Sequence, residues 1–466
     1  MAGRASAVAD LAVRFEQTVA AFVKEHRLPG AVAGVVVGDD LVWSGGYGFA
    51  DVAGRRAPDA HSLYRIASIT KTLTGTAVMQ LRDEGKLHLD DPAVVHLPEL
   101  AEAISPFGAV ETVTIRRMLS HESGLMGDPP DTDWTHNRYE GSASTNLARI
   151  GEIGTRIPAN TQQKYSNLAY QLLGEVVARR SGMPYVRYVR ANILDPLDMT
   201  STSFEPLTVE LEGRCAVGYR GRWMSDEPQP AKPWTEQVFA EGGLWSSVED
   251  LARWVGAQFR EDGGARGGAQ VLAGSTLREM HQPRYLGDEK WTEAWGISWY
   301  AVRRNDIVWV QHSGGLPGYI TNVCFHPGDD RVGAIALLNG IGEASDLSMA
   351  LGAIAMDAIA SAVEPAEPPV PTPEAYRDLL GLYGDAGDEA ILVRLEWRDA
   401  KLTFIDPDTP EWRPTLVPAG ESDRFIVDPG VRESGESVVF HRRGDGRVSW
   451  VSIGPFSLSR FDPVDR

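Results

Sequence analysis

The chain has 466 residues, 43% of them hydrophobic and 23% charged, which is typical of globular proteins that bury a large core. Its length is enough for two or three domains of about 100–200 residues each. A net charge of −19 at pH 7 repels nucleic acids and anionic lipids, so we expect neither nucleic acid nor a membrane surface as a partner.

The N-terminal 30 residues predict an amphipathic helix and not an export signal. Apolar residues from Leu11 to Phe22 recur at helical spacing, and charged residues interrupt the segment throughout. No stretch of about 18 uninterrupted apolar residues predicts a membrane span. The two cysteines, Cys215 and Cys324, lie far apart and outside any CxxC pattern, which favours free buried thiols. Together these features predict a cytoplasmic protein.

Strand-like and helical runs then follow one another along the chain. Residues 31–50 contain two strand-like runs joined by a Gly-Asp-Asp turn, which predicts a β-hairpin. A helix is predicted to start near Ser68, because apolar residues recur from Ile69 to Leu81 at helical spacing. From about residue 83 to 300, helical patterns alternate with long polar loops.

One of these loops, residues 126–144, is long enough to form a lid or a wall of a site. Three strand-like runs return between residues 305 and 340, and a helical run follows to about Ala362. Strands at both ends with helices between them predict one sheet built from the two termini of a domain, plus a helical insertion.

A proline-rich run separates this domain from a C-terminal region with a different pattern. Five prolines fall between residues 365 and 373, so we predict a stiff linker at 363–374 after a first domain at 10–362. Residues 375–466 consist of short runs of alternating apolar and polar residues with turn signals between them. This pattern predicts a small antiparallel sheet or β-barrel.

Ser68 and Lys71, in the run YRIASITKTLTG, are the first candidate catalytic residues. Lys71 is the only one of seven lysines with a serine three positions before it. On a helix, residues i and i+3 share a face, so we expect Lys71 to reach the Ser68 hydroxyl. A buried lysine has a lowered pKa and can take the hydroxyl proton, which turns the serine into a nucleophile. The alternative is an ordinary polar helix start, where serine is common.

Tyr165 and Asn167, just before another helical run, form a second candidate pair. Side chains two residues apart on a loop can face the same cleft. Tyr165 is suited to shuttle a proton between Ser68, Lys71 and a leaving group, and Asn167 is suited to hold Lys71 and a substrate amide. A surface turn with Asn167 as a helix N-cap explains the same residues without catalysis.

His312, Gly314 and Gly315 form the third candidate group, at the end of the strand-like run 307–310. Glycines here would let a substrate lie against the edge of a strand. A backbone N–H such as that of Gly315 could complete an oxyanion hole. The alternative is a glycine-rich turn with a structural histidine.

These three motifs, in this order and spacing, resemble those of the penicillin-recognising serine hydrolases. That family comprises class C β-lactamases, D-Ala-D-Ala peptidases, related carboxylesterases and D-aminopeptidases. Its pattern is Ser-x-x-Lys, then Tyr-x-Asn, then Lys/His-Thr/Ser-Gly, and residues 116–125, 193–204 and 242–254 are similar as well. The resemblance covers about residues 10–362. It implies an α+β, β-lactamase/transpeptidase-like fold, with a mixed antiparallel sheet flanked by helices and an all-helical region.

The resemblance also implies a role for each motif residue. Ser68 resembles the acylated nucleophile, Lys71 its base and Tyr165 the proton shuttle. Asn167 resembles the residue that positions these groups, and His312 stands where the third motif usually carries a cation. The N–H groups of the nucleophile and of the third motif resemble the oxyanion hole. The implied reaction is a two-step acyl transfer through an acyl-enzyme.

Two features differ from typical β-lactamases. These enzymes have lysine where this chain has His312, which is ordinarily neutral near pH 7, and this weakens the β-lactamase interpretation. The C-terminal region is similar to the lipocalin-like domain that follows some esterases, D-peptidases and peptide-cyclising thioesterases of the family. We therefore expect cleavage of an ester or amide bond in a small molecule or peptide. The alternatives are transacylation or peptide cyclisation, a β-lactamase, and a non-catalytic β-lactam sensor.

Motifs for other chemistries are missing from the sequence. There is no GxSxG nucleophile elbow, no HExxH or HxH metal pattern and no Gly-Lys-Ser/Thr phosphate loop. The sequence therefore predicts a serine hydrolase that uses neither a metal nor a cofactor. It does not predict the acyl group, the leaving group, their stereochemistry or the oligomeric state.

Overall fold

A computed structural model gives the structure of the chain. It describes residues 5, 8, 11–133, 139, 142–205, 207–221, 227–232, 239–260, 270–304, 307–361, 370–384, 392–398, 400–406, 413–420, 422–428 and 434–461. The chain divides into two compact units, Met1–Ala362 and Val363–Arg466. The linker proposed at 363–374 stays a prediction, because residues 363–369 lie outside the described residues.

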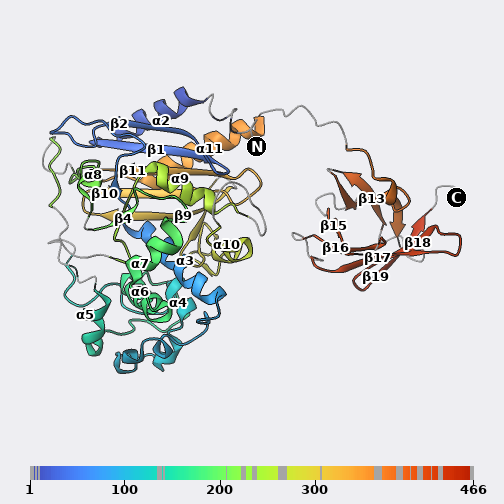
Figure 1. The fold of residues 1–466 in the computed structure, drawn as a ribbon, viewed down its shortest axis with the longest axis horizontal. Helices are drawn as coiled ribbons and strands as arrows, with labels where there is room; N and C mark the ends of the chain where they lie inside the picture. The colour runs from blue at the N-terminus through green and yellow to red at the C-terminus, as the bar shows by residue number, and fades with distance from the viewer. Residues whose placement is uncertain are drawn as a thin grey trace. The chain divides into compact units, whose positions relative to one another are not determined.

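An eight-stranded antiparallel sheet forms the centre of the first unit (Figure 1). In spatial order its strands are β2 (Asp40–Gly48), β1 (Gly30–Val37), β11 (Val332–Leu338), β10 (Tyr319–Phe325), β9 (Ile307–Leu316), β8 (Tyr300–Arg304), β7 (Glu293–Trp295) and β6 (Tyr285–Leu286). β1 pairs with β2 as the predicted hairpin and with β11 on its other side. The first and last parts of the unit therefore meet in one sheet, which confirms the prediction.

Helices cover both faces of this sheet, and the two faces of β1 explain why its sequence is apolar throughout. Ala33 and Val35 pack into a core with the helices α2 (Ala12–Glu25) and α11 (Ala344–Ser361). Val32 and Val36 point the other way, into a second core that includes α9 (Val248–Ala257). Figure 1 shows α2 and α11 together on one face and α9 on the other. Successive side chains of a strand point to opposite faces, so a strand that is buried on both faces carries apolar residues at every position.

The region beyond the sheet is mainly helical. It contains α3 (Thr70–Asp83), α4 (Ile115–Leu119), α5 (Ala143–Ala148), α6 (Asn167–Ser181), α7 (Tyr185–Val189), α8 (Val209–Glu212) and α10 (Gly274–His281). α3 is almost entirely buried and packs against α6. In Figure 1, α4, α5 and α6 lie at the opposite end of the unit from α2. No helix within the described ranges is long and apolar enough to cross a membrane.

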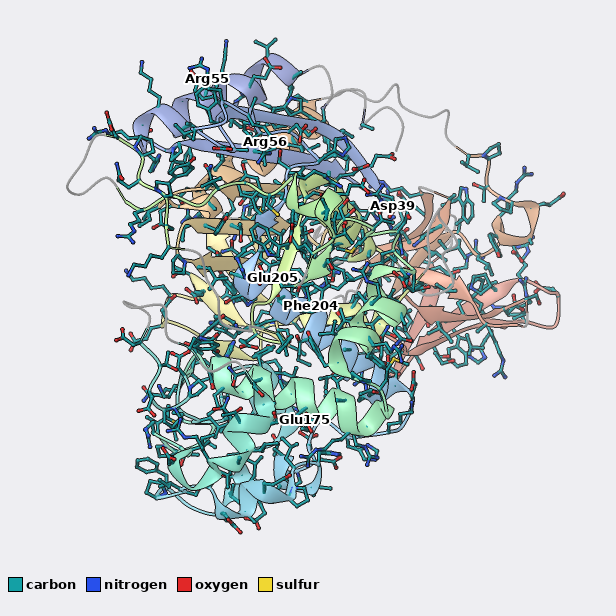
Figure 2. All side chains as sticks on the ribbon, turned by 60° about the vertical axis from the view of Figure 1, so that its left-hand side comes forward. Asp39, Arg55, Arg56, Glu175, Phe204 and Glu205 are labelled. Carbon is teal, nitrogen blue, oxygen red and sulfur yellow. The ribbon has the colours of Figure 1, made fainter. Side chains whose placement is uncertain are left out.

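A small sheet leads the chain into the serine motif. Its strands are β3 (Tyr64–Arg65), β5 (Leu244–Ser246) and β4 (Ser203–Phe204). The buried Arg65 side chain donates a hydrogen bond to Glu205, which also accepts one from the indole N–H of Trp245. Glu205 directly follows Phe204, the last residue of β4 (Figure 2). The Arg65 guanidinium lies 4.9 Å from the Trp245 ring centroid. These contacts hold β3, β4 and β5 together. Because β3 ends three residues before Ser68, they also fix the backbone that leads to the serine.

The second unit is a closed antiparallel β-barrel, which confirms the predicted barrel. Its strands are β12 (Gly381–Gly384), β13 (Leu392–Arg398), β14 (Lys401–Ile405), β15 (Thr415–Pro418), β16 (Arg424–Val427), β17 (Ser437–Arg442), β18 (Val448–Ile453) and β19 (Phe456–Phe461). β12 and β19 pair to close the barrel. Buried aromatic rings pack within it, namely Tyr383, Phe404, Phe425 and Phe440.

Both cysteines are free, as the sequence predicts. Cys324 is buried on β10, whereas Cys215 is only half-buried, so the expectation of two buried thiols is wrong for Cys215. Burial raises the pKa of Cys215 to about 11 and that of Cys324 to about 12. Both thiols are therefore protonated near neutral pH and are poor nucleophiles.

Candidate active site

Ser68 lies in a single 3₁₀ turn, Ala67–Ile69, directly before α3. The helix itself starts at Thr70, two residues later than the sequence pattern predicts. Ala67 has a φ of +46°, a left-handed conformation that is unfavourable for alanine and is found at functional sites more often than elsewhere. Ser68 is half-buried, whereas every other residue from 62 to 79 is buried. The turn therefore leaves one side chain of this segment open to solvent, and it is the serine.

Gly314 explains how strand β9 comes so close to this turn. A Cβ atom at Gly314 would lie 2.0 Å from the backbone oxygen of Ile66, so only glycine fits here. The Thr321 hydroxyl on β10 donates to the same Ile66 oxygen at 3.2 Å. The predicted third motif and the predicted serine motif thus meet in the fold, and Gly315 is exposed beside their contact.

Lys71 is fully buried and makes three short polar contacts through its Nζ atom. Nζ lies 3.1 Å from Ser68 Oγ, 2.8 Å from Asn167 Oδ1 and 2.6 Å from the backbone oxygen of Glu241. Burial in a low-dielectric interior lowers the pKa of Lys71, and the negative charges of Glu241 and Asp128 oppose that effect. The spacing of the Ser-x-x-Lys motif therefore brings the two side chains together as expected, across the end of the 3₁₀ turn.

Tyr165 and Asn167 both lie beside Lys71. Tyr165 forms a side-chain hydrogen bond with Ser68, and burial raises the pKa of its hydroxyl, which keeps it protonated. Its ring lies 5.0 Å from Lys71 Nζ. Asn167 is the first residue of α6 and not its N-cap. Ser166 holds the cap position instead, because its side chain accepts the Ala169 N–H.

His121, which the sequence analysis did not single out, supports this arrangement. Its ring stacks on Tyr165 with the centroids 4.2 Å apart, and its Nδ1 accepts the backbone N–H of Ser166 at 3.1 Å. Burial lowers the pKa of His121 well below its usual value, so the ring is neutral. His121 belongs to the segment 116–125 that resembles the family, and that resemblance was the only sequence signal for it.

His312 is buried and neutral. Its Nδ1 donates to the backbone oxygen of Ser313 at 2.7 Å, and its Nε2 has no hydrogen-bond partner among the described residues. Burial and the charge of Lys71 lower its pKa to about 3. Trp295 lies edge-on to His312, Tyr165 and His121, and thereby links the third motif to the other two.

Strand alternation separates the residues of the third motif onto two faces. His312 and Gly314 face the core that contains the serine turn, because their cross-strand partners are Val323 and Thr321. Ser313 faces the opposite side and bonds to Tyr300 and Asn322. The last residue of β9 that pairs with β8 is Gln311. Among the described strands, residues 312–316 therefore have a neighbour on one side only, and their other edge is free to pair with an extended ligand.

A second polar cluster lies behind Lys71 and was not predicted from the sequence. Gln171 of α6 donates from Nε2 to Tyr139 Oη at 2.8 Å and to Glu241 Oε1 at 3.0 Å, and its Oε1 accepts from Asn146. Asp128 accepts from the Asn167 side chain at 2.8 Å. Asp128 and Tyr139 both come from the loop 126–144, so its described part forms a wall of the site. Residues 134–138, 140 and 141 lie outside the described residues, so the role of this loop as a lid stays a prediction.

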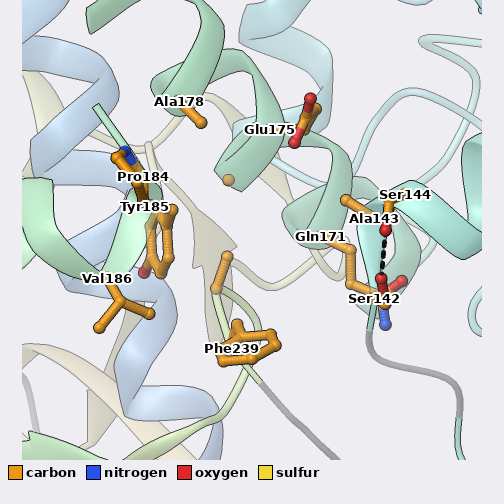
Figure 3. A pocket seen from close by; sticks show the side chains of 12 residues that line it. Ser142, Ala143, Ser144, Gln171, Glu175, Ala178, Pro184, Tyr185, Val186 and Phe239 are labelled. Carbon is orange, nitrogen blue, oxygen red and sulfur yellow. Dashed lines mark hydrogen bonds between the residues drawn. The ribbon is translucent and has the colours of Figure 1, made fainter. Parts of the chain in front are cut away.

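A pocket of about 280 Å³ lies next to this cluster, but it does not contain Ser68 or Lys71. Figure 3 shows Gln171 and Phe239 in its wall, with Pro184, Tyr185 and Val186 on one side. The Tyr185 hydroxyl hydrogen-bonds to Thr74 of α3 at 2.7 Å. The pocket therefore reaches the polar cluster through Gln171, and no residue of the serine turn lines it.

Comparisons with known proteins identify a family for most of the chain. Residues 15–356 match the family model described as "Beta-lactamase". "Protein flp" of Staphylococcus aureus (strain N315) is 27% identical over 325 residues, which cover 68% of this chain and 61% of that protein. "Beta-lactamase-like protein 2" of Dictyostelium discoideum is 28% identical over 309 residues, 65% of this chain and 54% of that one. The chain thus spans little more than half the length of these curated relatives.

Solved structures share the fold. The octameric penicillin-binding protein homologue from Pyrococcus abyssi superposes with a TM-score of 0.63 at 21% identity, covering 96% of this chain and 99% of its own. A D-stereospecific amidohydrolase from Streptomyces sp. gives a TM-score of 0.57 at 22% identity and covers 72% of this chain and 97% of its own. The α+β fold expected from the motifs is thereby confirmed, and this chain, which the family model matches over most of its length, belongs to the beta-lactamase family.

Proposed function

We propose that the protein is a serine hydrolase that forms an acyl-enzyme at Ser68 and cleaves an ester or amide bond. The observation that carries this proposal is the buried amine of Lys71, which lies 3.1 Å from the one partly exposed hydroxyl of its segment. A serine becomes a nucleophile when a base takes its proton, and a desolvated lysine is such a base near neutral pH.

The contacts of Lys71 favour one direction of proton transfer. A neutral amine has two N–H donors and one lone pair. Asn167 Oδ1 and the backbone oxygen of Glu241 can only accept, so they take the two N–H groups. The lone pair then faces Ser68 Oγ, whose hydroxyl proton it can receive. The same three contacts thus hold the amine and aim it at the nucleophile.

The reaction then follows in two steps. Ser68 Oγ bonds to the carbonyl carbon while its proton moves to Lys71, and the bond to the leaving group breaks as that group takes a proton through Tyr165. Water next attacks the acyl carbon and loses a proton to the same amine. The bond from that carbon to Ser68 Oγ breaks, Ser68 takes the proton from Lys71, and the acid leaves. The backbone N–H groups of Ser68 and Gly315 are our candidates for the oxyanion hole. Neither step needs a metal or a cofactor.

The neutral state of His312 bears on the substrate. A lysine at this position would offer a fixed positive charge to a substrate carboxylate, whereas an imidazole whose pKa is about 3 offers none at pH 7. We therefore expect uncharged esters or amides to react faster than β-lactams, which carry a carboxylate. The D-stereospecific amidohydrolase among the structural neighbours is compatible with an amide substrate. The free edge of β9 favours an extended, peptide-like acyl group.

The test is a substrate panel on the wild-type protein and on Ser68→Ala. It comprises p-nitrophenyl acetate, p-nitrophenyl butyrate, a D-amino-acid p-nitroanilide and nitrocefin, together with labelling by a fluorophosphonate probe read by mass spectrometry. We expect turnover or labelling in the wild type and its loss in Ser68→Ala. Ser181→Ala, at the end of α6, is the matched control and should behave as wild type. Undiminished labelling of Ser68→Ala would refute the proposal, and nitrocefin turnover as fast as that of the esters would refute the substrate assignment.

A further inference from the structure

We infer that the side-chain carboxyl group of Glu241, which does not contact Ser68, determines the pH at which Lys71 becomes a base. Glu241 is then a positioning residue, since it acts on the reaction only through Lys71. This inference rests on the proposed function, because it assigns a regulator to the proposed base.

The backbone and the side chain of Glu241 both belong to the surroundings of Lys71. The backbone oxygen accepts a hydrogen bond from Lys71 Nζ at 2.6 Å, and the side chain is 3% exposed. The chain then continues as Gly242 and Gly243 into β5, and the Leu244 N–H bonds to Thr70 on α3, the residue before Lys71. The backbone oxygen of Ala240, just before Glu241, accepts a hydrogen bond from Thr74 of α3, so the segment is attached to this helix on both sides of the lysine contact.

The carboxyl group itself is held by a network that does not touch the reacting atoms. Its Oε1 accepts from Gln171 Nε2 at 3.0 Å, and Gln171 is fixed in turn by Asn146 and Tyr139. Its Oε2 is buried and has no hydrogen-bond partner among the residues that the structure describes. A buried carboxylate oxygen without a partner is costly, so this environment disfavours the ionised form. Burial raises the pKa of Glu241, and hydrogen bonds from its own backbone, from Gln171 and from Tyr139 oppose that rise only in part.

Glu241 and Lys71 each oppose the effect of burial on the pKa of the other. The negative carboxylate raises the pKa of Lys71, and the ammonium lowers the pKa of Glu241. With one proton between them, the pair exists either as two neutral groups or as an ion pair. Only the neutral form presents the lone pair of Lys71 to Ser68. The carboxyl group therefore decides what fraction of the protein carries an active base at a given pH.

Other titratable groups also face this pair, and the experiment must separate them from Glu241. Asp128, beyond Asn167, is the other carboxylate whose charge acts on Lys71. The remaining neighbours are buried groups that stay neutral near pH 7, namely His121, His312, Tyr139, Tyr165, Tyr170 and Tyr185. Glu241 is distinguished from Asp128 by complete burial, because Asp128 is half-buried and screened by water.

The test measures the rate at which a fluorophosphonate labels Ser68 between pH 5 and 9, in the full-length wild type and in Glu241→Gln. In this reaction the Ser68 oxygen bonds to phosphorus, fluoride leaves and the hydroxyl proton moves to Lys71. Glutamine keeps the acceptor for Gln171 but removes the charge that stabilises the ammonium. Lys71 then loses its proton at lower pH, so the acidic limb of the rate profile should move down by about 1 pH unit. At a pH well below the midpoint of this limb, Glu241→Gln should therefore reach a fraction of its own plateau rate about tenfold higher than the fraction that the wild type reaches.

Two further variants separate the effect of the Glu241 charge from a general loss of stability. Glu241→Ala also removes the charge but leaves a gap, so it should show the same direction of shift even if it is less stable. Asp250→Asn removes another buried carboxylate, one bonded to Thr202 and Arg253, and should lower stability without moving the limb. An unchanged limb in Glu241→Gln would overturn the inference, even if its plateau rate fell. Labelling that persists in Ser68→Ala would instead overturn the proposed function, so the two failures can be told apart.

Discussion

The interior around Lys71 and the interior of the C-terminal barrel are built in opposite ways. Behind Ser68 the first unit buries a lysine, a glutamate, a histidine and two amides, linked by hydrogen bonds. Within the described part of the barrel, Thr403 is the one buried residue outside the apolar and aromatic types. Buried polar groups cost stability unless they are paired, so their concentration in one place indicates a functional site. The barrel interior shows only packing.

The largest effect should come from removing the proposed base. Lys71→Ala leaves Ser68 without a proton acceptor, and we expect ester hydrolysis and phosphonate labelling to fall by about 10²- to 10⁴-fold. Stopped assays at pH 7 on the folded variant measure this. Lys86→Ala, an exposed lysine on the turn after α3, serves as the control and should keep the wild-type rate. Equal rates in both variants would mean that the polar cluster is not a catalytic one.

A substitution in the barrel core should lower stability and leave activity unchanged. Phe404→Ala removes a fully buried ring, and such substitutions cost about 3–5 kcal/mol of unfolding free energy. The barrel transition should therefore occur at a lower urea concentration, while labelling of Ser68 by the small probe stays at its wild-type rate. Intrinsic fluorescence and the labelling assay measure the two properties on the same sample. A loss of labelling at urea concentrations where the barrel is still folded would show that the two units are not separate in function.

The pH dependence of stability should also come from the first unit, which buries four histidines, whereas the described barrel buries none. Burial lowers the pKa of His281 to about 3, against about 6.5 in an unfolded chain. Between these values the unfolded chain binds the extra proton, so the unfolding free energy falls as the pH drops below about 6.5, and for one such histidine by up to about 1.4 kcal/mol per pH unit.

Urea unfolding at several pH values from 4.5 to 7 tests this contribution. His281→Gln should make the decrease in stability shallower by that amount, since glutamine does not titrate. Gln282→Ala, at the exposed position next to His281, removes no titratable group and should leave the slope unchanged. The same slope in wild type and His281→Gln would contradict the assignment of His281 as a buried neutral ring.

The smallest effect is expected on the barrel surface. Lys401 and Asp428 form an ion pair at 2.8 Å, with the lysine side chain 53% exposed. Exposed pairs of this kind contribute about 0–1 kcal/mol, so Lys401→Ala should change the unfolding free energy by no more than that and leave activity untouched. Thermal unfolding at low and high salt measures the difference. A larger loss would show that this pair belongs to a more extended network.

Much of the site was predictable because its motifs are local. The three-residue spacing of Ser68 and Lys71 is set by helical geometry, and the two-residue spacing of Tyr165 and Asn167 is set by the start of α6. Two local details were not predictable. The serine lies in a 3₁₀ turn before the helix, and Ser166 caps α6 in place of Asn167.

The short strands β4 to β8 were not predicted, because residues 83 to about 300 carry mainly helical and loop patterns. The sequence by itself determined the N-terminal hairpin, the later strands that join it in one sheet, the second β-rich unit and the contact of Lys71 with Ser68. It did so because hydrophobic periodicity and short motifs depend on neighbours along the chain. Only the tertiary structure decided that His312 is neutral and that Glu241, 170 residues after Lys71, lies beside it. Proton affinity depends on burial and on charges brought together by the fold, and no local pattern in the sequence encodes them.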